Sequence, residues 1–456
     1  MSQQKNNQSF LQSYFKLSEN NTNVRTEVVA GITTFITMAY IMIVNPQILS
    51  ATGMNFQAVF VATCIASAIG TLIMGLYANL PFAQAPGMGL NAFFTYSVCM
   101  GMHYTWQEAL AAVFISGVLF IIITVTSIRE KIVDALPQNL KLAISGGIGL
   151  FIALIGLKDG GLVVSNSETL VSFGKFVEPG PLLTIIGIII IAVLMSRKVK
   201  GSILIGIIAT TLIGLPLGVT KISGNLVNFN ISLAPTFMKM DFGGLFTHTS
   251  GNLVNAGFFG AFLSLIMVVL TFSLVDLFDT IGTLVGTAQK AKMLDENGKV
   301  KNMSKALVSD AVATTVGSVL GTSTVVTYVE STSGISEGGR TGLTSVVVGI
   351  LFLLSLFFGG LVGIVPSQAT APALIIVGVL MMGSVTKINF DDFTEALPAF
   401  FTIAMMPFSY SIANGIACGL IFYPIVKIVT GRHKEVHPIV YVLAFLFIVR
   451  FIILPS

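Results

Sequence analysis

The sequence predicts an all-α polytopic membrane protein whose 14 transmembrane segments form a 7+7 inverted repeat, with short strands in segments 3 and 10. Hydrophobic residues make up 54% of the 456 residues and charged residues only 10%, whereas an average soluble domain carries roughly 25% charged residues. Apolar runs of the roughly 17–25 residues that a spanning helix needs recur along the chain. Basic residues gather between alternate runs. A soluble enzyme is excluded, because too little polar surface is available to cover a particle in water.

The first 26 residues form a polar tail that we expect to stay in the cytosol, because residues 1–24 lack the apolar core and cleavage site of a signal peptide. The apolar runs that follow lie near 27–49, 57–77, 107–127, 139–157, 181–196, 201–219, 258–287, 303–320, 341–365, 368–384, 395–411, 413–430 and 437–454. The three cysteines, Cys64, Cys99 and Cys418, lie inside apolar stretches without CxxC spacing. We expect neither a disulfide nor a metal site from them.

Two further stretches, 81–101 and 321–336, are apolar but interrupted by Gly, Pro, Ser and Thr. Such sequences predict segments that are part extended and part helical. Irregular backbone is tolerated at membrane depth only where it is buried in protein or lines a cavity. These two segments are therefore the places where a functional site is expected.

The runs divide into two matching halves on either side of a polar loop at 220–252. Each half has seven runs, and the third run of each half is the broken one, so the second half is expected to be inverted. With the N-terminus in the cytosol, the tail and the predicted inner loops hold 19 of the 24 Lys and Arg residues, and the outer loops hold four. This asymmetry supports the topology. The run at 437–454 breaks the parity and is predicted to be a peripheral helix, although a fifteenth span is an alternative.

Ionisable groups inside apolar runs are candidates for function, because a charge at the bilayer centre costs roughly 2.5–3.5 kcal/mol on insertion scales. Four acids qualify: Asp276, Asp279, Asp310 and Glu330. No Lys, Arg or His lies at comparable depth. Buried carboxylates favour a neutral hydrogen-bonding substrate, a cation or a proton, and disfavour an anion. Any of the four could instead hydrogen-bond only to neighbouring protein groups.

The two broken segments offer similar polar layouts. Residues 322–329 favour an extended chain, and Ser331 then begins a short helix beside Glu330. In the earlier segment an extended stretch precedes Gly87 and Gly89, which allow close backbone approach. Asn91 follows with both a donor and an acceptor for a planar heterocycle, and the aromatic residues Phe93, Phe94 and Tyr96 come next.

These residues resemble the azaguanine-type purine permease branch of the nucleobase–cation symporters (nucleobase:cation symporter 2, xanthine/uracil permease-like). The similarity extends over nearly the whole chain. It is carried by RTEVVAGITTFITMAYIMIVNPQIL at 25–49, APGMGLNAFF at 85–94, DLFDTIGTLVG at 276–286, YVESTSGISEGGRTGLTSVVVG at 328–349 and LPAFFTIAMMPFSYSIANGI at 397–416.

The resemblance implies a core (transport) domain at 27–127 and 258–365 and a gate domain at 139–219 and 368–430. It implies that Asn91, Asp279 and Glu330 form the purine site and that Tyr328 lies beside the base. Asp279 is preferred to Asp276 because in this fold an acid precedes the glycine, here Gly282, by three residues. Thr283 stands where uracil-type relatives can carry histidine, so proton transfer would rest on carboxylates.

We therefore expect proton-coupled import of purine nucleobases, either adenine or guanine and hypoxanthine, by alternating access in the cell membrane. Glu330 would accept N–H groups of the base, and Phe93, Phe94 or Tyr328 would stack on its ring. Asp279 is the first candidate for the coupling proton, with Glu330 beside it. We expect no catalytic residue, cofactor, metal or nucleic-acid partner, and a homodimer from the resemblance alone. Three alternatives are an anion transporter of the same fold, a membrane-embedded Mg²⁺-dependent enzyme that uses DLFD, and a sensor or scaffold. Sodium coupling is an alternative to proton coupling.

Overall fold

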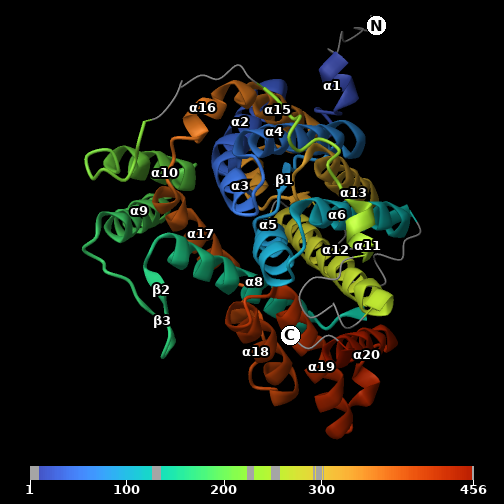
Figure 1. Cartoon of the computed structure of the whole chain (residues 1–456). Coiled ribbons are helices and arrows are strands. Elements are labelled where there is room, and N and C mark those ends of the chain that lie inside the picture. Colours follow the sequence, from blue (N-terminus) through green and yellow to red (C-terminus); the bar gives the residue numbers. More distant parts are fainter. Residues whose placement is uncertain are drawn as a thin grey trace, which may run out of the picture.

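The computed structural model describes residues 10–125, 135–222, 231–247, 257–290, 293, 300 and 302–453. This part of the chain is mostly helical (Figure 1). Nine helical stretches in it are long and apolar enough to cross a membrane, and three shorter apolar helices accompany them. The structure therefore supports a multi-pass membrane protein, and the count of 14 segments in two inverted halves stays a prediction.

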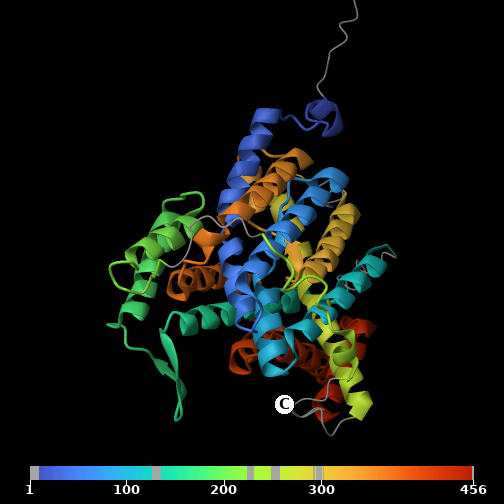
Figure 2. The same cartoon turned by 45° about the horizontal axis from the view of Figure 1, so that its top comes forward.

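A first group of helices packs around the two broken segments and combines both halves of the sequence (Figures 1 and 2). In it α15 packs against α2 and α4, and α13 packs against α4 and α6. The group consists of α2 (Val24–Met38), α3 (Ile41–Ser50), α4 (Phe56–Ile73), η1 (Met74–Ala78), α5 (Met88–Ala92), η2 (Phe93–Gly101), α6 (Trp106–Val125), α12 (Gly257–Lys290), α13 (Met303–Leu320), α14 (Ser331–Ser336) and α15 (Gly342–Leu354).

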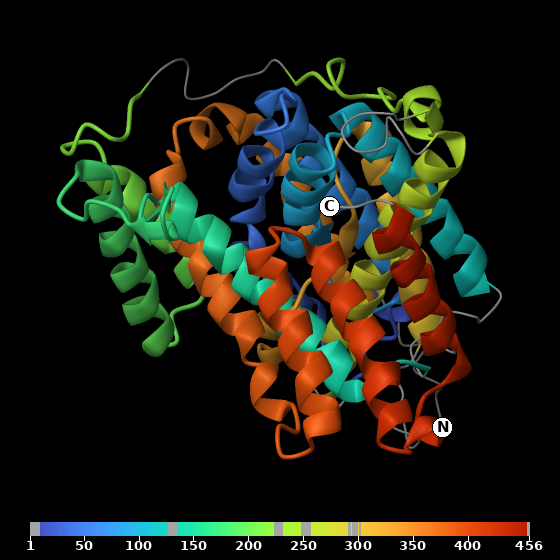
Figure 3. The ribbon, with the colours of Figure 1, turned by 60° about the horizontal axis from the view of Figure 1, so that its bottom comes forward.

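A second group lies beside the first and again combines both halves (Figure 3). Helix α8 packs against α17 and α18, α18 packs against α19, and α9 packs against α10 and α17. The group consists of α8 (Gln138–Asp159), α9 (Pro179–Ser196), α10 (Ser202–Ile213), α17 (Ser367–Met382), α18 (Phe393–Phe408), α19 (Ile412–Val429) and α20 (Pro438–Ile453).

Short elements connect these helices. A hairpin of β2 (Val163–Asn166) and β3 (Leu170–Phe173) lies between α8 and α9. The others are α1 (Phe10–Tyr14), α11 (Phe242–Thr247), η4 (Ser355–Phe358), α16 (Gly359–Val362), η5 (Val385–Lys387) and η6 (His433–Glu435).

The two broken segments meet head to head through a pair of buried strands. Strand β1 (Gln84–Pro86) pairs antiparallel with β4 (Val325–Thr327), with Ala85 opposite Val326. Two further backbone hydrogen bonds extend the pair, from Gly87 N to Thr324 O (3.0 Å) and from Tyr328 N to Ala83 O (2.9 Å). Strands form where the sequence predicts them, and each leads into a short helix, α5 or α14.

The start of α15 explains the RTGL stretch at 340–343. Glu27 of α2 is fully buried, and its carboxylate accepts hydrogen bonds from Arg340 N (2.9 Å), Thr344 N (3.2 Å) and Thr344 Oγ1 (2.6 Å). A carboxylate at a helix N-terminus satisfies amides that lack intrahelical partners. Gly342 has room for no side chain, since a Cβ there would lie 1.9 Å from the carbonyl oxygen of Gly75. These contacts fix α15 to α2.

Two apolar runs form shorter helices than their length predicts. In the run at 201–219, α10 ends at Ile213, and in the run at 341–365 the 3₁₀ turn η4 follows α15. The run at 437–454 forms α20, which packs against both α19 and α12. That α20 is a peripheral helix therefore stays a prediction.

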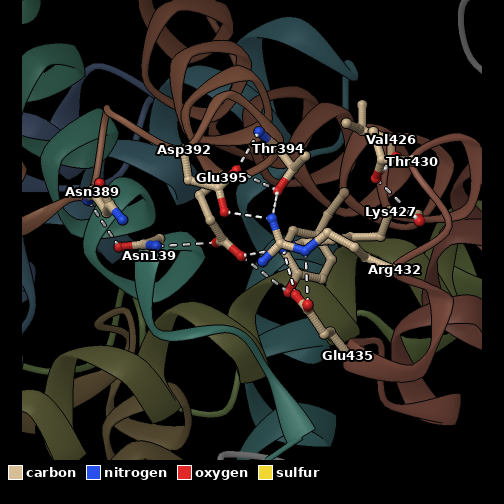
Figure 4. Close-up of polar contacts among 11 residues, drawn as sticks. Asn139, Asn389, Asp392, Thr394, Glu395, Val426, Lys427, Thr430, Arg432 and Glu435 are labelled. Atoms are coloured by element: carbon tan, nitrogen blue, oxygen red, sulfur yellow. Dashed lines mark hydrogen bonds and ion pairs between the residues drawn. The ribbon is translucent and has the colours of Figure 1, made fainter.

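A charged cluster joins the ends of the helices α8, α18 and α19 (Figure 4). Lys427 is fully buried and pairs with Glu395 (2.7 Å) and Glu435 (2.8 Å). Asn139 of α8 donates to Glu395 Oε2 (3.0 Å). Arg432 pairs with both Asp392 (2.6 Å) and Glu435 (2.7 Å).

The hydrogen bonds in this cluster shift the ionisation of its outer members. Those from Thr394 and Arg432 hold the pKa of Asp392 well below its ordinary value. Those from Arg432 and Lys427 lower the pKa of Glu435. Both carboxylates therefore stay ionised, and the cluster stays paired, at neutral pH.

Replacing Lys427 by Met should destabilise the protein by about 3 kcal/mol, because the largely buried carboxylate of Glu395 loses its charged partner. Lys434→Met is the matched control, since Lys434 is an exposed lysine in the following turn η6. Thermal unfolding in detergent measures both variants. Equal melting temperatures for the two variants would contradict the structural role of Lys427.

Candidate functional site

Two adjoining cavities lie between the two groups of helices. The larger has a volume of about 520 Å³ and the smaller about 430 Å³. The walls come from α5, α12 and the β4–α14 segment on one side and from α8 and α17 on the other. The residues that line both are Gly89, Leu142, Ser145, Asp279, Thr283, Met381, Ser384 and Lys387.

Glu330 and two tyrosines form the polar wall of the larger cavity. Glu330 immediately precedes α14. Tyr40 donates its phenolic hydrogen to Glu330 Oε1 (2.6 Å), and Tyr328 donates to the backbone oxygen of Pro86 (2.6 Å). All three residues line this cavity. Strand β4 leads into Tyr328 and Glu330, and the junction of α2 and α3 supplies Tyr40, so a carboxylate and two aromatic rings surround one space.

Asp279 lines both cavities from α12. Within the described part of the chain it makes no hydrogen bond or ion pair. The carboxylates of Asp310 and Glu330 act on it electrostatically. Asp279 is thus an acid whose oxygen atoms remain available to a ligand or a proton.

Two lysines line the same cavities, which corrects the inference that no base accompanies the acids. Lys387 of η5 lines both cavities and Lys141 of α8 lines the smaller one. The sequence places them at the ends of apolar runs, where they mark topology. Their long side chains reach the cavity from those positions, so the cavity carries charge of both signs.

Glycines shape the walls. A Cβ at Gly89 would lie 2.6 Å from Ile148 Cγ2 of α8, so only glycine allows the two groups to approach there. At Gly282 and Gly286 a Cβ would meet nothing within 4 Å. These two positions line the smaller cavity and keep it wide on the α12 side.

Asp276 and Asp310 belong to a buried polar network behind the strands rather than to the cavity wall. Thr280 donates to Asp310 Oδ1 (2.8 Å) and lies 3.4 Å from Asp276 Oδ1. Gln84 of β1 donates to Asp310 (3.5 Å) and accepts from Ser309 (3.1 Å). The network connects α12 and α13 to the strand pair, which is the structural alternative that the sequence left open for these two acids.

Asn91, Phe93 and Phe94 lie behind the cavity wall. All three are fully buried and none lines either cavity. Asn91 Oδ1 accepts a hydrogen bond from Ser323, and Asn91 Nδ2 has no partner among the described residues. Phe93 packs edge-on against Phe272, with ring centroids 4.7 Å apart. Ring stacking by Phe93 or Phe94 is therefore not what the structure favours, because the helix turns both rings into the core.

Tyr40 was not predicted as a site residue. It lies between α2 and α3 inside an apolar run, and no local pattern separates it from a core aromatic. Only its hydrogen bond to a residue 290 positions away identifies it. The aromatic rings on the cavity wall are accordingly those of Tyr40 and Tyr328.

The walls combine acceptors, hydroxyl groups and aromatic surface. Asp279 and Glu330 supply carboxylate oxygens, and Ser145, Thr283 and Ser384 supply hydroxyl groups. Such a set matches a flat heterocycle that presents several N–H groups and ring nitrogens.

Comparisons with known proteins agree with this chemistry. The sequence profile of the Permease family (Xan_ur_permease) matches residues 25–418. The chain is 46% identical to the adenine permease AdeP of Escherichia coli, covering 99% of this chain and 98% of that protein. It is 45% identical to the guanine/hypoxanthine permease PbuG of Bacillus subtilis, covering 97% of this chain and all of that protein.

A solved structure shares the fold. The transmembrane domain of the cyanobacterial bicarbonate transporter BicA superposes with a TM-score of 0.63 at 15% sequence identity, covering 87% of this chain and 97% of that domain. At this identity the similarity concerns the fold alone.

Of two threonines on α12, Thr280 belongs to the buried polar network and Thr283 lies on the cavity wall. Thr280→Val should cost about 2 kcal/mol of stability, because buried Asp310 loses a hydrogen-bond donor. Thr283→Val, one turn away on the cavity wall, should stay within about 0.5 kcal/mol of the wild type. Thermal unfolding in detergent compares them, and a larger loss for Thr283→Val would show that the two faces of α12 are wrongly assigned.

Proposed function

The chain belongs to the Permease family, and we propose that it imports purine nucleobases, adenine or guanine and hypoxanthine, by proton-coupled secondary transport. The observation that carries the proposal is the pair of carboxylates, Asp279 and Glu330, on the wall of one cavity. Full-length similarity to purine permeases supports it independently. These relatives are transporters, which favours transport over the alternative of a membrane-embedded enzyme.

In the proposed complex, Glu330 accepts hydrogen bonds from N–H groups of the base. Tyr40 continues to donate its hydrogen bond to the same carboxylate. Tyr328 packs against the ring, since its side chain is fixed by Pro86 at the cavity wall. Asn91 contributes through Nδ2, which has no partner among the described residues, after a small movement, or through Oδ1 by positioning Ser323. Phe93 and Phe94 support α5 from the core.

Asp279 is proposed to carry the coupling proton. It has no hydrogen bond or ion pair within the described residues, and other acids surround it. Neighbouring carboxylates favour a shared proton because two like charges in one dry site cannot both ionise easily. Protonation of Asp279 would allow the loaded site to move through the membrane with one charge fewer.

The two groups of helices are proposed to act as the core (27–127 and 258–365) and the gate (139–219 and 368–430) of an alternating-access cycle. Lys141 and Lys387 at the cavity lie at the ends of apolar runs, on the side that the charge bias assigns to the cytosol. The cavity would then face the cytosol in this structure, with the N-terminal tail on the same side. A homodimer is an expectation of the family resemblance.

An anion carrier is the second candidate. One observation favours it, the presence of Lys141 and Lys387 on the cavity walls. Competition for uptake distinguishes the two candidate functions. Excess bicarbonate would inhibit uptake by an anion carrier, whereas excess purine would not.

Cells that express the chain should take up labelled purine. Unlabelled adenine, guanine and hypoxanthine should inhibit this uptake, in an order that gives the preference of the protein among them, and uracil should not inhibit it. Glu330→Ala should lower apparent affinity at least tenfold, by loss of charge-assisted hydrogen bonds, which are worth about 1.5–3 kcal/mol. Asp279→Asn should abolish concentrative, pH-sensitive uptake.

Asp391→Asn is the matched control for these variants, because Asp391 is exposed. Concentrative and pH-sensitive uptake by Asp279→Asn would overturn its role as proton carrier. Unchanged purine affinity in Glu330→Ala would remove Glu330 from the site.

A further inference from the structure

Helix α8 runs from the cavities to a cluster of side chains that lies beyond them. Its first half lines the cavities with Gln138, Lys141, Leu142, Ser145 and Ile148. Its last residues, Lys158 and Asp159, do not line either cavity. Fourteen residues separate Ser145 from Asp159, which corresponds to about 21 Å of helix. The two ends of α8 therefore lie at opposite ends of the space between the helix groups.

A cluster of aromatic and charged side chains lies at the Asp159 end of α8. Tyr96 of η2 lies near Asp159 of α8, and their side chains interact electrostatically. Tyr410, between α18 and α19, meets Tyr96 edge-on (ring centroids 5.9 Å apart) and Phe151 edge-on (5.4 Å). Lys158 Nζ lies 3.5 Å from Tyr410 Oη and 5.2 Å from the centre of its ring.

The cluster crosses the boundary between the two helix groups. Tyr96 belongs to the first group, which carries Glu330 and Asp279, whereas Asp159, Phe151 and Tyr410 belong to the second. η2 also packs against α19 at this end. Separating the groups here would break the Tyr96–Asp159 contact and the edge-on pair of Tyr96 and Tyr410, and would leave contacts inside each group intact.

The backbone holds Tyr410 in place for this contact. Tyr410 has φ +52°, a left-handed conformation that is uncommon for a residue with a side chain. The bend between α18 and α19 points the Tyr410 ring toward Tyr96 and Phe151. Such strained positions persist where the surroundings determine them, and they are frequent at functional sites.

We propose that Tyr96 and Asp159, with Tyr410 packed between the two groups, form the gate that closes this end and must part before the cavity opens on the Asp159 side. The inference rests on the proposed transport function for its place in the cycle. By the predicted topology this is the extracellular gate. Tyr96 and Asp159 are positioning residues, because neither lines the cavity.

Site-directed labelling tests this gate without substrate. Val377→Cys, on the wall of the larger cavity, is placed in a chain whose Cys64, Cys99 and Cys418 are replaced by Ala. A membrane-impermeant maleimide is added from either side of oriented vesicles. In the parent, labelling should occur from the Lys141 side and be slow from the Asp159 side.

Tyr96→Phe and Asp159→Asn should each raise the labelling rate from the Asp159 side about tenfold, which corresponds to about 1.4 kcal/mol in the opening equilibrium. The double variant should add little, because both changes remove one contact. Tyr104→Phe is the matched control, since Tyr104 donates to Ser264 within the first group (3.0 Å).

Labelling from the Lys141 side shows that each variant is folded. Rates from the Asp159 side equal to those of Tyr104→Phe, in either folded variant, would overturn the gate. Because no substrate is used, a failed purine uptake assay with a positive labelling shift would refute the proposed function and leave the gate standing.

Discussion

The antiparallel pairing of β1 with β4 is the constraint on which the rest of the structure depends. Two extended segments at membrane depth leave backbone groups that lipid cannot satisfy. Here each segment satisfies the other, through Ala85 opposite Val326 and through Gly87 N and Tyr328 N at the two ends. The pairing fixes where α5 and α14 begin, and so it places Gly89 on one side of the cavity wall and Glu330 on another. Because the two segments are 243 residues apart at Gln84 and Thr327, both halves of the chain must fold to create the site.

The strand pair also divides the buried acids into two classes. Behind it, Asp310 is held by Thr280 and Gln84 and connects the helices α12 and α13 to the strands. In front of it, Glu330 has one protein donor, Tyr40, and Asp279 has none within the described residues. A carboxylate whose hydrogen bonds are taken up by the protein stabilises the fold, and one with free oxygen atoms can bind a ligand or a proton. The lysines on the opposite wall come from the second group of helices, so movement between the groups changes the charge that surrounds Asp279.

Much of this arrangement follows from local sequence. Interrupted apolar runs predicted both broken segments, the strands within them and the short helices after Gly87 and Glu330. The direction of a side chain around its helix does not follow, because it depends on packing between helices that are distant in sequence. For that reason the sequence placed Phe93 and Phe94 beside a ligand while the structure buries them, and Tyr40 was indistinguishable from a core aromatic. The pairing of Glu27 with the start of α15 is likewise invisible until residues 313 positions apart are brought together.

The central claim is that the cavity beside the paired segments, with the carboxylates of Asp279 and Glu330 on its wall, carries an uncharged purine together with a proton. The most direct measurement is flux through the purified protein in liposomes, with labelled adenine or hypoxanthine outside and an imposed pH gradient that is acid outside. The account predicts purine accumulation that requires the gradient, collapses with a protonophore and acidifies the interior. Accumulation driven equally well without a pH gradient by sodium, or transport of bicarbonate without transport of purine, would contradict it.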